Sequence, residues 1–309
     1  MAVRHEWRGQ AVIVGADDRT GALEVAGSCA AAGGAVEVTV WPARPVADGV
    51  VDLGTRELDP ASAAQRAAAF APAAWKLDSR LRGNWPAELR ALATTTERAV
   101  WVVAALPSMG RICVDGVVRS STEVFGRPGK ALGDAAIVWD AVTAADLADV
   151  GARWRALPER ERPVLAGTSA AVAAAVAPDV APQPSRLPAP IVVACGSLHP
   201  AARAELGSLP PGVVVVATDP ERVVEPERAA QALAEQLHRI GPIGTLVIVG
   251  GATAAAVLGD GPVLVGGLLA PGVPWARRPD GAGPLIVTRS GGFHGPAALA
   301  PLLEAHCSS

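Results

Sequence analysis

Short apolar runs alternate with helical patterns along most of the chain, and this alternation predicts an α/β protein. In the first half, strands are predicted over residues 11–15, 36–40, 75–77, 99–105 and 135–139, and helices over 21–32, 86–95, 143–157 and 169–177. In the second half, strands are predicted over residues 191–195, 213–217, 245–249 and 285–288, with the clearest helix over 225–238. Strands separated by helices favour mostly parallel sheets with right-handed crossovers.

A proline-rich stretch separates the two halves. The segment PDVAPQPSRLPAP carries five prolines in thirteen residues and has little periodicity, which is typical of a semi-rigid linker. The pattern therefore predicts an N-terminal domain over residues 1–177, a linker over 178–190 and a C-terminal domain over 191–309. Each domain is expected to be a mostly parallel sheet flanked by helices, with a ligand cleft between the two.

Composition excludes several classes of function. The 309 residues carry a net charge of -3, which gives no electrostatic reason to expect binding to nucleic acid or to an anionic membrane. No apolar run reaches the ~18 residues of a membrane helix, and the N-terminus lacks a signal-peptide core. The four cysteines are far apart in the sequence, which favours reduced thiols over a zinc site and indicates a cytoplasmic protein.

Two adjacent carboxylates, Asp17 and Asp18, directly follow the first predicted strand. In open α/β sheets, ligands bind beyond the carboxyl ends of the strands, so this position is a candidate site. Asp18 or Thr20 could simply cap the next helix. A single cap does not explain the whole sequence Asp-Asp-Arg-Thr-Gly, so an acid that orients and deprotonates a hydroxyl is the alternative.

A second polar cluster follows the strand predicted over residues 75–77. The segment WKLDSRLRGN holds Lys76, Asp78, Ser79, Arg80, Arg82 and Asn84. Arginine can bind a carboxylate through two parallel hydrogen bonds, so the cluster indicates an anion site. The alternative is a surface salt-bridge cluster, in which Arg82 would pair with a neighbour such as Glu88. Arg111 follows a later strand and is either a further anion contact or part of a solvated loop.

The C-terminal half has three strand-to-helix turns built from small residues. They are Gly196-Ser197, the segment Gly250-Gly251-Ala252-Thr253, and Ser290-Gly291-Gly292. Turns of this kind can hold phosphates with backbone N–H groups and hydroxyls. None matches a P-loop or a complete dinucleotide fingerprint, and any one of them alone could reflect ordinary helix–sheet packing.

Taken together, these motifs resemble those of the four-carbon acid sugar kinase family. Its D-D-x-T-G-A motif is matched by Asp17, Asp18, Thr20, Gly21 and Ala22, and its K-x-D-S-T-L-R-G-N motif by Lys76, Asp78, Ser79, Leu81, Arg82, Gly83 and Asn84. Gly110 and Arg111 match a later G-R pair, and the three C-terminal turns match the G-S, G-G-E-T-A and S-G-x-F-G turns. The resemblance spans nearly the whole chain, in order.

The resemblance implies ATP-dependent phosphorylation of a hydroxyl on a small sugar acid, such as a threonate, with ATP and Mg²⁺ as cofactors. The implied catalytic residues are Asp18 and Asp17. The implied substrate-binding residues are Arg19, Lys76, Asp78, Ser79, Arg82, Asn84 and Arg111. The implied nucleotide-binding residues are Ser197, Gly250, Gly251, Ala252, Thr253, Ser290, Gly291 and Gly292. Metal ligands are not assigned, and a homodimer is left open.

Three residues depart from the family pattern. Arg80 stands where the family has Thr, Ala252 stands where it has Glu, and His294 is an addition to the last turn. The chain is also shorter than is usual for the family, so it resembles a short, divergent member. These departures motivate the alternative of a non-catalytic ligand-binding or regulatory protein on the same scaffold.

Overall fold

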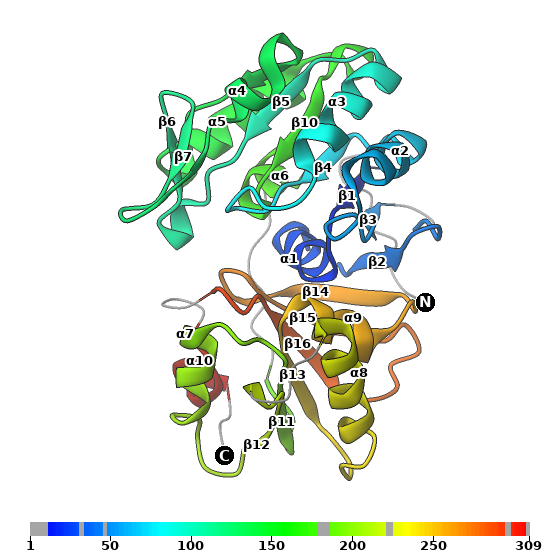
Figure 1. Ribbon diagram of the computed structural model, residues 1–309, viewed down its shortest axis with the longest axis vertical. Coiled ribbons are helices and arrows are strands. Elements are labelled where there is room, and N and C mark those ends of the chain that lie inside the picture. Colours follow the sequence, from blue (N-terminus) through cyan, green and yellow to red (C-terminus); the bar gives the residue numbers. More distant parts are fainter. Residues whose placement is uncertain are drawn as a thin grey trace.

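The computed structural model describes residues 12–30, 34–45, 48–177, 186–220, 225–293 and 298–306. Within these ranges the chain forms one 13-stranded sheet, a separate three-stranded sheet and helices that pack around them (Figure 1). The predicted α/β class is confirmed.

Seven parallel strands form the N-terminal part of the large sheet, in the order β2-β3-β1-β4-β10-β5-β9. Their bounds are β1 (Ile13–Ala16), β2 (Val36–Val40), β3 (Gly49–Asp52), β4 (Ala74–Lys76), β5 (Val100–Val103), β9 (Ala136–Val138) and β10 (Val164–Gly167). The helices of this half are α1 (Arg19–Cys29), α2 (Pro60–Phe70), α3 (Trp85–Thr96), α4 (Pro128–Leu132), α5 (Ala144–Ala156) and α6 (Ser169–Val176). The small sheet, at the top of Figure 1, consists of β6 (Ile112–Val114), β7 (Val117–Arg119) and β8 (Val124–Gly126).

The C-terminal half contributes six strands. β12, β11, β13 and β16 are parallel, and a hairpin of β14 and β15 runs antiparallel to its neighbours. Their bounds are β11 (Ile191–Cys195), β12 (Val214–Ala217), β13 (Thr245–Val249), β14 (Val263–Ala270), β15 (Val273–Arg277) and β16 (Leu285–Arg289). The helices are α7 (Pro200–Leu206), α8 (Pro226–Leu237), α9 (Gly251–Leu258) and α10 (Leu299–His306).

The two halves share one continuous sheet because β14 pairs antiparallel with β2, where Val263, Leu264 and Val265 face Val38, Glu37 and Val36. The two parallel sets therefore run in opposite directions, and in a flat sheet their carboxyl ends would lie at opposite edges. β14 contains two register shifts, and such bulges bend and twist a sheet. The bend allows both sets of strand ends to face the same cavity. Residues 178–185 of the predicted linker lie outside the described residues.

Helix α1 lies at the junction of the two halves (Figure 1). All its residues except Ser28 are buried, because it packs on α6 and also on β14, β15 and α9. The strand β1 ends and α1 begins at Asp17 and Asp18, so this turn is held by both halves. The three described cysteines are buried and unpaired, and Cys307 lies outside the described residues. No helix in the described ranges combines the length and the hydropathy needed to cross a bilayer.

Candidate functional site

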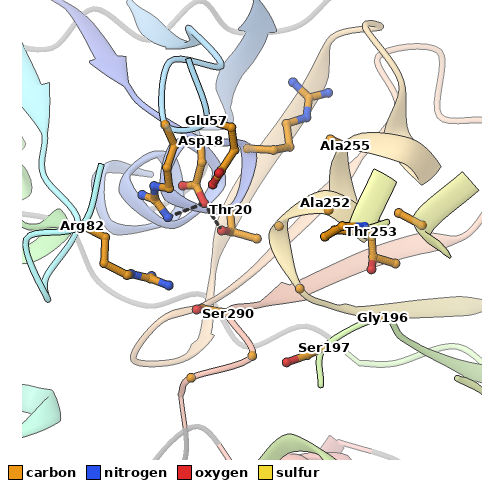
Figure 2. A pocket seen from close by; sticks show the side chains of 18 of the residues that line it. Asp18, Thr20, Glu57, Arg82, Gly196, Ser197, Ala252, Thr253, Ala255 and Ser290 are labelled. Atoms are coloured by element: carbon orange, nitrogen blue, oxygen red, sulfur yellow. Dashed lines mark hydrogen bonds and ion pairs between the residues drawn. The ribbon is translucent and has the colours of Figure 1, made fainter. Parts of the chain in front are cut away.

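A cavity of about 780 Å³ lies between the strand ends of the two halves, a volume typical of small-molecule sites. Figure 2 shows Asp18, Thr20 and Glu57 with Ala252, Thr253 and Ser197 across from them. Of the sequence-predicted site residues, the following line it: Asp17, Asp18, Arg19, Arg82, Arg111, Ser197, Gly250, Gly251, Ala252, Thr253, Ser290, Gly291 and Gly292. The polar cluster after β1 and the three C-terminal turns thus meet in one place.

Asp17 and Asp18 are held together by a residue that the sequence did not indicate, Arg56. Its Nε and Nη2 donate to the two carboxylate oxygens of Asp17 at 2.8 and 2.7 Å, and its Nη1 donates to Asp18 Oδ2 at 2.8 Å. Burial raises the pKa of the Asp17 carboxyl, and the Arg56 guanidinium opposes this shift. The same two carboxylates raise the pKa of Arg56. The Arg56 guanidinium therefore offsets the repulsion between the two adjacent carboxylates in this turn.

Asp18 is both a helix cap and a cavity residue. Its Oδ1 accepts from the Gly21 N–H at 2.7 Å as the N-cap of α1, and its Oδ2 accepts from the Thr20 hydroxyl at 2.9 Å. A methyl group at Gly251 would lie 3.3 Å from Asp18 Oδ2, so the carboxylate stands at the first turn of α9 in the other half. The capping prediction is confirmed, and Asp18 is also placed where the two halves meet.

Asp78 organises the loop that follows β4. It accepts from Arg82 Nε at 3.0 Å and Nη2 at 2.6 Å, and from the Arg80 N–H at 2.9 Å. The hydrogen bonds from Arg82 and the charge of Arg56 outweigh burial, so the pKa of Asp78 lies far below its usual range. In the alternative interpretation Arg82 pairs with an acid such as Glu88; it does form an ion pair, but the partner is Asp78. The Arg82 side chain is 56% exposed and still lines the cavity.

Lys76 and Asn84 are not among the residues that line the cavity. Lys76 Nζ donates to the Leu77 carbonyl at 2.9 Å and lies 3.4 Å from Glu24 Oε2. Asn84 Nδ2 donates to the carbonyls of Thr55 and Leu58 at 2.9 and 2.7 Å. Asn84 therefore supports the loop that carries Arg56 rather than lining the cavity itself.

Arg111 is one of two buried arginines that line the cavity, the other being Arg19. It is 7% exposed, its Nη1 donates to the Ser79 hydroxyl, and it forms no ion pair with any described residue. Burial lowers its pKa, and Asp78 partly offsets this. A buried guanidinium without a carboxylate partner is well suited to bind an anionic group of a ligand.

Arg19 lines the cavity and also contacts the other half of the protein. Its Nη2 donates to the carbonyls of Gly259 and Gly261, each at 3.1 Å, just beyond the C-terminus of α9. Cations are favourable near the C-terminus of a helix, so this contact joins α1 to α9. Arg19 therefore connects the two halves, and its known contacts do not involve the anion-binding side chains.

The C-terminal turns are packed so closely that two of their glycines leave no room for a side chain. A Cβ at Gly196 would overlap Thr253 Oγ1, and a Cβ at Gly291 would overlap Ser197 Oγ. Gly250, before the first turn of α9, has φ +116, which residues with a side chain rarely adopt. The three turns form a single cluster of backbone and hydroxyl groups around the N-terminus of α9. His199 caps α7 through Nδ1, and His294 lies outside the described residues.

Several lining residues were not expected from the sequence. They are Asp52 at the end of β3, Gly54, Arg56 and Glu57 after it, Pro226, Glu227, Ala230 and Gln231 at the start of α8, and Ala255, Ala256 and Phe293. The sequence pattern does not predict β3, and it therefore does not indicate the polar residues that follow this strand. The start of α8 carries no polar motif, and only the fold brings it to the cavity. Among the described residues, no group of three His, Cys, Asp or Glu side chains could hold a metal ion.

Glu88, on α3, is a fully buried acid without an ion-pair partner among the described residues. Burial raises its pKa to about 7, and Asp17 adds to the shift. The folded state therefore keeps this proton to a higher pH than the unfolded state, and stability falls as the pH rises from about 4.5 through about 7.

Replacement Glu88→Gln removes this titration. Relative to the variant, the wild type should lose up to about 3 kcal/mol of stability between pH 4.5 and pH 8, because ionising a buried acid is unfavourable. Urea denaturation of both proteins at several pH values measures the difference. If the free energies of unfolding of wild type and variant differ by the same amount at pH 5 and pH 8, the raised pKa of Glu88 is contradicted.

Comparison with known proteins relates part of this site to a family of sugar-binding domains. Residues 12–131 match the family model of a sugar-binding N-terminal domain, which includes the β1–α1 turn, the β4–α3 loop and Arg111. No curated protein sequence gives a significant match.

Solved structures resemble the chain over nearly its whole length. A Salmonella typhimurium LT2 protein, provisionally named a tRNA synthase, is 17% identical with a TM-score of 0.70, and the match covers 95% of this chain and 98% of that one. Haemophilus influenzae protein HI1011, of the family DUF1537, is 16% identical with a TM-score of 0.63, and the match covers 95% and 99%. At these identities the likeness establishes the fold.

Proposed function

We propose that the protein is an ATP-dependent kinase that phosphorylates a hydroxyl group of a small sugar acid. The observation that carries this proposal is the single cavity in which an unpaired buried arginine, a carboxylate and three Gly/Ser/Thr turns meet. The match of residues 12–131 to a sugar-binding domain supports the N-terminal wall as the sugar side.

The acid end of the substrate would bind at Arg111. Its guanidinium is buried and not neutralised by a described carboxylate, so an incoming carboxylate supplies the missing charge. Arg82 stands half-exposed on the same side and can add a further donor. Arg80, which replaces the family's Thr, is bound to Glu123 at 2.9 and 2.7 Å and is thus less available.

The phosphates of ATP would bind at the C-terminal turns. Gly251 and Ala252 open α9, so their N–H groups have no partner inside the helix and face an anion favourably. Ser197, Thr253 and Ser290 bring hydroxyls to the same cluster. Replacing the family's Glu by Ala252 removes a negative charge beside the phosphates and leaves these N–H groups in place.

Asp18 lies between these two ends and is the proposed proton acceptor. Its carboxylate would take the proton of the sugar hydroxyl while that oxygen bonds to the γ-phosphorus and the bond to the leaving ADP oxygen breaks. Arg56, which contacts both acids, would keep the charge and direction of Asp18 fixed. Phosphoryl transfer depends mainly on such positioning and on charge stabilisation.

Mg²⁺ fits this site as a companion of the nucleotide. The ion takes most of its ligands from phosphate oxygens and water, so the protein need supply no more than one or two carboxylates, here from the pair Asp17 and Asp18. This agrees with the lack of any three-ligand metal cluster among the described residues. When bound, Mg²⁺ would neutralise charge on the transferred phosphate.

The test is turnover. Purified protein with Mg²⁺ and ATP is assayed for ADP release on D- and L-threonate and D- and L-erythronate, and the product is identified by mass spectrometry. We expect ADP and a phosphorylated acid with at least one of them. Binding of both ATP and an acid without turnover would favour the regulatory alternative, and no binding of ATP would overturn the proposal.

A further inference from the structure

Phenylalanine is rare in this chain, and most of its phenylalanines lie against a single arginine. The sequence contains three, and two of them contact Arg111. The Arg111 Cζ lies 5.8 Å from the ring centroid of Phe125 and 5.2 Å from that of Phe293. These distances are within the range of cation–π attraction. The proposed acid-binding cation is thus held by aromatic rings rather than by a carboxylate.

The two rings belong to different halves of the protein. Phe125 is on β8 of the small sheet, where the Arg80 guanidinium also lies over its ring at 5.5 Å. Phe293 comes directly after the turn formed by Ser290, Gly291 and Gly292, and its side chain is 5% exposed. Arg111 is therefore contacted at once by the sugar half and by the nucleotide half.

The position of Phe293 is set by the C-terminal half. A Cβ on Gly272, in the turn between β14 and β15, would overlap the Phe293 ring, so the ring is seated against this glycine. Phe293 also belongs to the C-terminal apolar cluster, which extends across the junction to Leu106. Leu106 in turn exchanges backbone hydrogen bonds with Arg111 at 2.8 and 3.1 Å.

We propose that Phe293 is a positioning residue that couples the nucleotide turn to the acid-binding Arg111. This inference rests on the proposed function, because it assigns phosphates to the turn at 290–292 and a carboxylate to Arg111. A nucleotide that orders this turn also fixes the ring directly after it. The Arg111 Cζ lies over this ring, and only Nη1 donates to a described side chain, so the other guanidinium N–H groups remain for the acid.

The consequence is that the nucleotide should strengthen binding of the acid, and by linkage the acid should strengthen binding of the nucleotide. Desolvation increases cation–π attraction, and Arg111 is buried, so loss of one ring should be measurable. The effect should appear in the affinity for the acid, because the ring contacts Arg111, the proposed acid-binding cation.

The experiment is calorimetric titration of the acid that supports turnover, with and without Mg²⁺ and a non-hydrolysable ATP analogue. For the wild type we expect at least about fivefold tighter acid binding when the analogue is present. For Phe293→Leu we expect the acid Kd with analogue to rise about 2- to 30-fold. The coupling, which is the ratio of the acid Kd without analogue to that with analogue, should approach 1. The analogue Kd without acid should change less than about twofold. Phe293→Tyr, which retains the ring, should restore the acid affinity.

The third phenylalanine provides a matched control. Phe70 is also buried, lies under Arg44 at 4.7 Å and contacts Trp41, but it is not among the cavity residues. Phe70→Leu should lower stability and leave the acid affinity and the coupling unchanged. Phe125→Leu should weaken acid binding equally with and without the analogue.

The outcomes separate the two proposals. If the wild type binds acid and analogue but Phe293→Leu keeps both the acid affinity and the coupling, this inference is wrong and the proposed function stands. A loss of coupling that Phe70→Leu reproduces would also overturn it, because the effect would then follow general stability. If the wild type binds no acid or no analogue, the proposed function fails and this inference fails with it.

Discussion

Asp18→Asn should lower kcat by about 10²- to 10⁴-fold while the protein remains folded. The carboxylate is the proposed proton acceptor, and an amide of the same shape cannot take the proton. Folding should survive because Asn is nearly as good an N-cap as Asp, so the bond from the Gly21 N–H to Oδ1 is retained. Steady-state kinetics with ATP and the acid acceptor measure the loss, and analogue titration shows whether nucleotide binding is kept.

Asp59→Asn is the control for the capping role of Asp18. Asp59 is the N-cap of α2 and accepts from the Ala61 and Ser62 N–H groups at 3.1 and 3.0 Å, but it is not a cavity residue. This variant should retain full kcat. If Asp17→Asn is inactive and Asp18→Asn is active, the proton acceptor is the other member of the pair.

Arg56→Met should destabilise the protein by about 3–5 kcal/mol and abolish turnover, because it removes one partner of a buried ion pair. Asp17, whose side chain is 3% exposed, would lose both of its charged hydrogen bonds, and Asp18 would lose one. The pKa of Asp17 should rise further without the opposing cation. The variant should therefore lose more stability at pH 8 than at pH 5, where the acid can hold its proton.

Denaturation of wild type and variant at both pH values measures this effect. Arg56→Lys should recover only part of the loss, because an ammonium cannot reproduce the fork that contacts Asp17 twice. Arg66→Met is a suitable control, since Arg66 donates to the Leu53 carbonyl at 2.7 Å and forms no ion pair with any described acid. Equal stability of Arg56→Met and wild type at pH 8 would show that the triad of Asp17, Asp18 and Arg56 is not a stabilising unit.

The location of the candidate site could be predicted from the sequence, because polar residues after apolar runs mark the carboxyl ends of strands. Arg56 was missed for a specific reason. β3 has only four residues, Gly49–Asp52, and α2 after it is rich in alanine with weak periodicity, so neither was predicted. Had β3 been identified, the same rule would have led to the Thr55-Arg56-Glu57 segment that follows it.

The direction of side chains could not be predicted in the same way. Lys76, Asp78 and Asn84 belong to one motif, yet Lys76 binds the Leu77 carbonyl and Asn84 binds the loop at Thr55. A motif places residues near a site, and the packing around each one decides whether it faces the ligand. Arg19 shows the same limit, because it lines the cavity with Asp18 yet its Nη2 binds carbonyls after the end of α9.

The pairing of β14 with β2, which joins the two halves, could not be predicted from the sequence either. β14 contains Gly266 and Gly267 and two register shifts, which obscure the alternation of a strand. Its pairing with β2 brings together residues more than two hundred positions apart, and local propensity carries no information about such a partner. The alternation of strands and helices was therefore sufficient to predict the class of fold, but not the seam, the pairing of β2 with β14 that joins the two halves.

That seam limits how far the halves can be treated as modules. If the chain were cut in the proline-rich stretch, β2 would become an uncovered edge strand with its ladder groups free to pair with another chain. Helix α1 would also lose its cover from β14, β15 and α9, which exposes an apolar surface. A fragment ending near residue 177 should therefore self-associate. An exchange of halves between relatives would succeed only if β2, β14 and the faces of α1 were exchanged as matched surfaces.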